Sequence, residues 1–161
     1  MQITEPFTML TDYALGAADL LFAVSLFSAI HPKNRVTALL LGLGFLAGAV
    51  SGFAGGTFHG FALHFQEAGL RRVWNTTLLS IGATAAFLGS GVHAADVRKE
   101  NGKWIVAALV LTLMGLGIQA TGFRSRRFFN HNDIFHVMQT TSMCLFFRGA
   151  RRLEDRAYSP K

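Results

Sequence analysis

Apolar residues dominate five long stretches of this chain, and few charged residues interrupt them. The stretches cover residues 12–30, 36–65, 74–93, 104–123 and 130–147. Each reaches, or falls slightly short of, the ~20 residues that a helix needs to cross a hydrocarbon layer ~30 Å thick. The pattern predicts an all-α fold, a polytopic transmembrane bundle of about five helices. We expect the 161 residues to form a single integral membrane domain.

The basic residues of the chain predict its orientation in the membrane. A net charge of +6 would suit nucleic-acid binding in a soluble protein, but here the Lys and Arg residues lie almost entirely in loops and in the tail. Five of the 15 fall on the side that holds the N-terminus, which we call side A, and the other ten fall on the opposite side, side B. Basic loops favour the cytoplasm, so we predict a bacterial inner-membrane protein with its N-terminus outside and its C-terminus inside.

This placement makes membrane lipids, and not nucleic acids, the expected partners. The final segment 148–161, RGARRLEDRAYSPK, departs from the apolar pattern and carries several positive charges. We predict a basic cytoplasmic tail that lies near anionic lipid headgroups.

The second stretch contains a regular row of glycines. In GLGFLAGAVSGFAGGTFHG, glycine recurs at positions 44, 48, 52, 56 and 60. Residues four apart share one face of a helix, and a face without side chains lets another helix approach to backbone contact. We therefore predict that the second helix is the central packing helix. The row could serve a seam within the monomer, in a homo-oligomer or in a larger membrane complex.

Ionisable residues interrupt three of the predicted helices at a similar depth. Asp19, His59 and His136 each lie about six or seven residues from the side-A end of the stretch that contains them. Such residues cost at least ~2.5 to 3.5 kcal/mol at the centre of a membrane helix, so they usually pair, line a cavity or bind an ion. Asp12 lies two turns before Asp19 on the same face, and Asp133 lies one turn before His136, where its carboxylate is predicted to orient the imidazole.

Imidazoles and carboxylates gathered at one depth are typical of a zinc site. Catalytic zinc takes three protein ligands and leaves one position for water. We predict His59 and His136 as two ligands, with His131 or one of the acids Asp12, Asp19 and Asp133 as the third.

Two short segments resemble motifs of a known superfamily. SGFAGGTFHGF and NDIFHVMQ are similar to motifs of the CREST superfamily of membrane hydrolases and receptors, which includes the alkaline ceramidases and the progestin and adiponectin receptors. In that superfamily a histidine late in helix two and an H-x-x-x-H pair at the start of the last helix hold zinc. The resemblance matches His59 to the first and His136 to the end of the pair, whereas Asn132 stands at the position of the pair's first histidine and His131 precedes it.

The resemblance implies a zinc-dependent hydrolase of a lipid amide or ester. In this hypothesis Asp19 moves a proton and Ser51 hydrogen-bonds the developing oxyanion. Two alternatives stay open from the residues alone. One is a haem-binding membrane protein with His59 and His136 as axial ligands, and the other is an accessory subunit of a larger membrane complex with no chemistry of its own.

Overall fold

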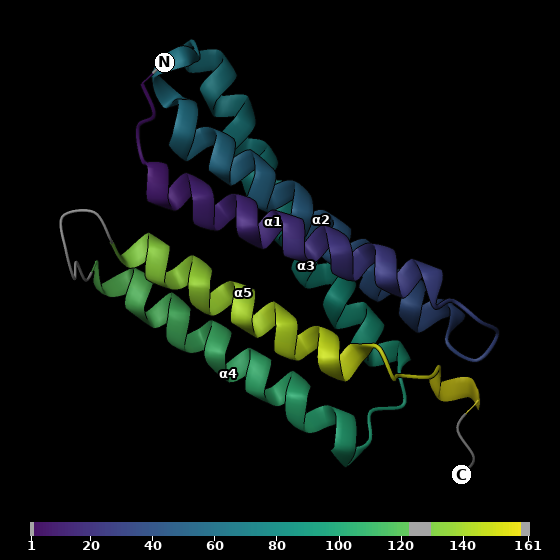
Figure 1. The fold of residues 1–161 in the computed structure, drawn as a ribbon. Helices are drawn as coiled ribbons and strands as arrows, with labels where there is room; N and C mark the ends of the chain where they lie inside the picture. Colours follow the sequence, from purple (N-terminus) through teal and green to yellow (C-terminus); the bar gives the residue numbers. More distant parts are fainter. Residues whose placement is uncertain (1, 123–129, 159–161) are drawn as a thin grey trace.

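The computed structural model describes residues 2–122 and 130–158, and these residues form five α-helices (Figure 1). The helices are α1 Pro6–Ser28, α2 Arg35–Phe61, α3 Glu67–Ala94, α4 Lys99–Thr121 and α5 His131–Ala150, with short 3-10 turns at Ala62–His64 and Arg156–Tyr158. The predicted all-α fold of about five helices is confirmed. The predicted end of the fourth stretch, at position 123, lies outside the described residues.

The distribution of side chains is that of an integral membrane protein. Among the described residues, α1 to α4 are the helices long and apolar enough to cross a membrane, whereas α5 has 20 residues and a more polar face. Large apolar side chains point outward on three helices: Leu21, Leu79 and Leu113 are 69%, 75% and 67% exposed. Asp19 and Asp133 are fully buried. Apolar groups outside and carboxylates inside are what a hydrocarbon solvent selects.

The helices contact one another mainly in the spatial order α3, α2, α1, α5, α4. Figure 1 shows α4 and α5 as an antiparallel pair beside α1, with α2 packed along the other side of α1 and α3 crossing behind α1. The polar face of α5 is therefore turned toward α1. This contact brings the side-A ends of α1 and α5 together.

The glycine row of α2 packs mainly against α1. A Cβ placed on Gly52 would lie 2.7 Å from the backbone nitrogen of Gly16 and 2.8 Å from the backbone oxygen of Asp12. Toward side B the row turns to α3, where the side chain of Leu88 covers Gly44. Half of the apolar window of α2 is buried, a larger share than in α1, α3 or α4. The prediction that α2 is the central packing helix is confirmed.

Aromatic side chains fill the side-B half of the bundle. Phe22 of α1 stacks on Phe147 of α5 with ring centroids 4.4 Å apart, and Phe45 of α2 meets Phe146 edge-on at 6.0 Å. Phe45 is fully buried. Offset and edge-to-face contacts between rings add to the dispersion that holds helices together in lipid. This core fixes α1, α2 and α5 relative to one another and leaves the polar groups to the side-A half.

The segment after α5 is part of the folded bundle. Asp155 accepts hydrogen bonds from the backbone N–H groups of Val36 (3.1 Å) and Thr37 (2.8 Å), the first turn of α2. Asn34, the N-cap residue of α2, makes no capping bond of its own. Burial alone would raise the pKa of Asp155, but the hydrogen bonds from Thr37 and Val36 outweigh it and hold the pKa below its ordinary value. Asp155 therefore caps α2 from the far end of the sequence.

Candidate functional site

The first two turns of α1 carry the polar residues that face α5. Proline is favoured at the first position of a helix because its missing N–H has no intrahelical partner there, and α1 begins at Pro6. Thr8 and Asp12, four residues apart, then lie on one face of the helix. Both side chains are buried. The early start of α1 thus places Asp12 two turns inside the bundle from side A.

The first turn of α5 is held by a capping box that also engages α1. The side chain of Asn130 accepts from the backbone N–H groups of Asn132 and Asp133, and Asp133 accepts in return from the Asn130 N–H at 2.8 Å. The other oxygen of Asp133 accepts from the Thr8 hydroxyl at 2.7 Å. Asp133 is 0% exposed and both its oxygens are engaged. Its role is to anchor α5 to α1.

His136 takes its partners from α1 and not from Asp133, so the expected orienting pair does not form. Its Nε2 lies 3.3 Å from Oδ1 of Asp12, and its Nδ1 lies 3.3 Å from the Thr11 hydroxyl oxygen. The hydroxyl hydrogen of Thr11 is directed at backbone carbonyls of its own helix, 3.0 and 3.1 Å away. In the tautomer that keeps this hydroxyl hydrogen on the carbonyls, the hydroxyl oxygen accepts from Nδ1–H, and the Nε2 of a neutral His136 carries no hydrogen.

In this tautomer a lone pair on Nε2 of His136 faces an acceptor. Nε2 of His136 and Oδ1 of Asp12 are both acceptors when the imidazole is neutral and the carboxylate ionised. The second Asp12 oxygen, Oδ2, is buried without a hydrogen-bond partner and lies against Gly55. Two acceptors at 3.3 Å repel each other unless a positive species lies between them. In this tautomer the pair requires an added proton or a metal cation between the two atoms.

His59 completes a group that we call the side-A cluster: Glu5, Asp12, His59 and His136. Nδ1 of His59 lies 2.9 Å from the Glu5 carboxylate, and the backbone N–H of Glu5 donates to the His59 carbonyl at 3.1 Å. The side chains of His59 and Glu5 are 16% and 43% exposed. The ring centroids of His59 and His136 are 6.4 Å apart. Glu5 thus forms the exposed end of the cluster and Asp12 its buried end.

Three predicted site residues lie away from this cluster. The Asp19 carboxylate packs on Gly48, seven residues deeper along each helix than the contact between Asp12 and Gly55. Ser51 lies on the same deep portion of α2, eight residues before His59. Among the described residues no hydrogen bond or ring contact joins His131 to either site histidine, and its Nδ1 is buried without a partner. The structure thus brings together His59, His136 and Asp12.

Metal-ligand geometry is only partly present in this conformation. Within residues 2–122 and 130–158, no group of three or more His, Cys, Asp or Glu side chains is arranged to hold a metal ion. Asp12 and His136 supply two donors at close range, and His59 is the nearest further imidazole.

Sequence reasoning missed the contributions of Glu5, Thr8 and Thr11. All three precede Asp12, where the apolar stretch begins, and so lay outside the predicted helix. The signal that could have found them is Pro6, a residue typical of a helix start. A helix counted from Pro6 brings Thr8 and Asp12 onto one face, level with the start of α5.

The fold and the cluster define a class: a polytopic α-helical membrane protein with a buried polar site at one end of its bundle. A family profile described as "Family of unknown function (DUF6962)" matches residues 7–97 and 88–155. The chain belongs to this family. No curated protein and no solved structure matches the chain. None of these comparisons links it to the CREST superfamily.

Proposed function

We propose that the chain is a membrane-embedded hydrolase whose side-A cluster holds a divalent metal ion, zinc in the first instance. The observation that carries the proposal is the 3.3 Å contact between Nε2 of His136 and Oδ1 of Asp12. A charge-assisted N–H···O bond is usually 2.7–2.9 Å long, so the contact is long for one. Two ligand atoms at ~2.0 to 2.1 Å from one tetrahedral ion lie about 3.3 Å apart.

The residues around this pair suit a metal donor set. The buried, unpartnered Oδ2 of Asp12 is a free donor atom. Glu5 on Nδ1 of His59 leaves Nε2 of that ring available, and a carboxylate behind a ligating imidazole is a common arrangement at metal sites. His59 would supply the third ligand through a small approach toward His136. Such an approach is local, because His59 lies in the last turn of α2.

A metal ion bound here would activate a water molecule for attack on an acyl carbonyl. The chain's own residues prepare that chemistry. Thr11 and Glu5 contact the Nδ1 atoms of His136 and His59 and orient these rings, and Asp133 anchors the helix that carries His136. Glu5, at the exposed end, is better placed than Asp19 to exchange a proton with water.

The substrate class follows from where the site lies. The cluster is near the ends of α1, α2 and α5, which we expect at the level of a membrane surface, where a lipid amide or ester can arrive by diffusion in one leaflet. The similarity of NDIFHVMQ and SGFAGGTFHGF to the CREST motifs supports the same chemistry. Haem is less well supported, because iron at Nε2 of His136 would have to displace Asp12.

Elemental analysis of the purified full chain tests the proposal. We expect about one zinc ion per chain, removed by a chelator and restored by added zinc. Asp12→Asn and His136→Ala should lose the metal, while His93→Ala, an exposed histidine at the side-B end of α3, should retain it. Hydrolysis of a fluorescent lipid amide should follow the metal content.

Two results would overturn the metal proposal. One is that the parent chain binds zinc no better than the Asp12→Asn variant. A shared proton, and not a metal ion, would then explain the contact between Asp12 and His136. The other is a Soret absorbance band in the parent, which would restore the haem hypothesis. If the chain bound the metal but hydrolysed no lipid, the metal site would stand and the hydrolase function would be refuted.

A further inference from the structure

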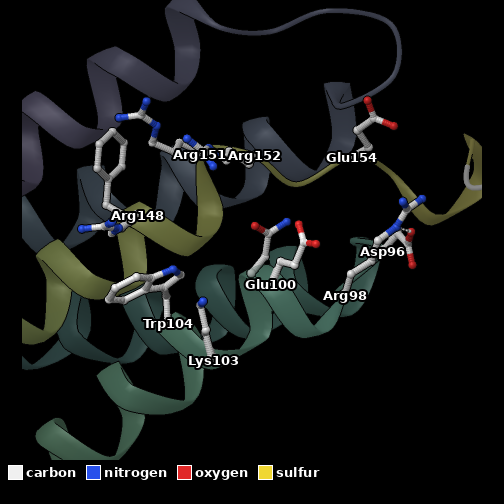
Figure 2. Close-up of a pocket in the computed structure, with 11 residues that line it drawn as sticks. Asp96, Arg98, Glu100, Lys103, Trp104, Arg148, Arg151, Arg152 and Glu154 are labelled. Atoms are coloured by element: carbon white, nitrogen blue, oxygen red, sulfur yellow. Dashed lines mark hydrogen bonds and ion pairs between the residues drawn. The ribbon is translucent and has the colours of Figure 1, made fainter.

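A second polar site lies at the opposite end of the bundle. A cavity of about 1010 Å³ opens at side B where α4 begins and α5 ends (Figure 2). Gly149 lets these two helices approach there, since a Cβ at this position would lie 3.0 Å from the Asn101 carbonyl oxygen. The cavity thus sits between two helix ends, at the expected level of the lipid headgroups.

The cavity is lined by more positive than negative groups. The basic residues are Arg98, Lys103, Arg148, Arg151 and Arg152, and the acidic residues are Asp96, Glu100 and Glu154. Arg98 is held by Asp96 at 2.9 Å. In the part of the chain that the structure describes, no carboxylate forms an ion pair with the other four cations. The lining thus has five positive and three negative groups, and this excess of positive charge favours the binding of an anion.

Trp104 holds part of this basic group in place. The Arg148 guanidinium lies over the indole ring, 4.1 Å from its centroid, and the Lys103 ammonium lies 5.6 Å from it. Both distances are in the range of cation–π interactions. Tryptophan is itself enriched at the membrane interface. The contact fixes the guanidinium at the cavity wall, and guanidinium groups bind phosphate oxygens through paired N–H donors.

The charges are separated within the cavity. Figure 2 shows Arg148, Trp104 and Lys103 at one end and Glu154, Asp96 and Arg98 at the other, with Glu100 between them. If a phosphodiester binds at the basic end, the rest of its headgroup lies near the carboxylates, which accept hydrogen bonds. A glycerol headgroup has hydroxyls that donate such bonds and adds no positive charge.

We propose that this cavity binds the headgroup of an anionic phospholipid, with phosphatidylglycerol as the fitting chemistry. The phosphate lies among Arg148, Arg151 and Arg152, and the glycerol hydroxyls face Glu100. The position at the helix ends and the ring of Trp104 favour a membrane lipid over free phosphate. The site is separate from the side-A cluster and does not depend on its function.

Quenching of Trp104 fluorescence by brominated lipids tests this site. The chain has two tryptophans, so Trp74→Phe leaves Trp104 as the single probe. In phosphatidylcholine bilayers, brominated phosphatidylglycerol should quench Trp104 more than brominated phosphatidylcholine at equal mole fraction. Each basic group near a membrane surface contributes about a fivefold increase in binding. Arg151→Gln combined with Arg152→Gln should thus lower the preference roughly 25-fold.

The matched control removes two charges from side A. Arg71→Gln combined with Arg72→Gln should leave the preference unchanged, and raised salt should weaken the preference in the parent without any mutation. Equal quenching by the two brominated lipids would overturn the proposal, as would an unchanged preference in the variant of Arg151 and Arg152. If glycerol phosphate in the buffer abolished the preference, the ligand of the cavity would be a soluble phosphate and not a lipid. If brominated phosphatidylethanolamine quenched Trp104 as strongly as brominated phosphatidylglycerol, the cavity would not select an anionic headgroup and the proposal would be refuted.

Discussion

Replacing Gly52 by Ala tests the close crossing of α1 and α2. The added Cβ would lie 2.7 Å from the nitrogen and 2.8 Å from the Cα of Gly16, and 2.8 Å from the Asp12 carbonyl oxygen. All three are backbone atoms, so no side-chain rotation can relieve the contact and the helices must separate. Overpacking of this kind costs about 1–3 kcal/mol. Alanine also favours a helix over glycine by about 1 kcal/mol, which opposes the loss.

A glycine in open space removes this ambiguity. Gly82 of α3 has no atom within 4 Å of the position its Cβ would occupy. Gly82→Ala therefore carries the same gain in helix propensity without the contact. Between the two variants we expect the free energy of unfolding, measured by circular dichroism in mixed detergent micelles, to differ by about 1–3 kcal/mol. Equal values would show that α1 and α2 do not cross at Gly52.

Three further predictions concern other parts of the chain. Asp155→Asn should speed hydrogen exchange of the two amides that it caps. Because the pKa of Asp155 is held below its ordinary value, the parent's protection should persist above pH ~4 and fall as the pH drops further; pH-independent protection would contradict the cap. Thr8→Val should cost ~1 to 3 kcal/mol of stability by leaving a buried carboxylate oxygen unpaired, whereas Thr141→Val, at an exposed threonine of α5, should be nearly neutral. Cysteines at Glu67 and Glu100 should react with an impermeant reagent from opposite sides of the membrane; reaction from one side would refute the topology.

Hydropathy predicts the membrane part of a helix better than its ends. The five helices were predictable because a run of about 20 apolar residues in lipid must satisfy its own backbone hydrogen bonds, and a helix does so within one segment. α3 begins at Glu67, seven residues before the predicted start, and α4 begins at Lys99, five before it. The added turns carry charged residues that keep them out of the apolar stretches, and they continue the helical hydrogen bonds. Composition alone marks where the lipid ends, and so could not mark these boundaries.

The candidate site was predictable in its histidines, whereas its carboxylate was predicted only as one of three acids, Asp12, Asp19 and Asp133. His59 and His136 were expected to lie near each other, and their ring centroids are 6.4 Å apart. The depth of Asp19 was counted from residue 12, whereas α1 starts at Pro6. The six-residue difference moves Asp12 to the level of the histidines and Asp19 below it. Pairing across helices depends on such offsets, which a periodic pattern within one helix does not contain.

The cap of α2 by Asp155 has a consequence for the order in which the protein is made. The first turn of α2 emerges from the ribosome early, but Asp155 follows Thr37 by 118 residues. Until Asp155 is synthesised, the N–H groups of Val36 and Thr37 must bond to water or to lipid headgroups. A nascent chain cut short before Asp155 would leave the start of its central helix uncapped. The cap of the central helix thus depends on a residue that enters the chain only after all five helices have been made.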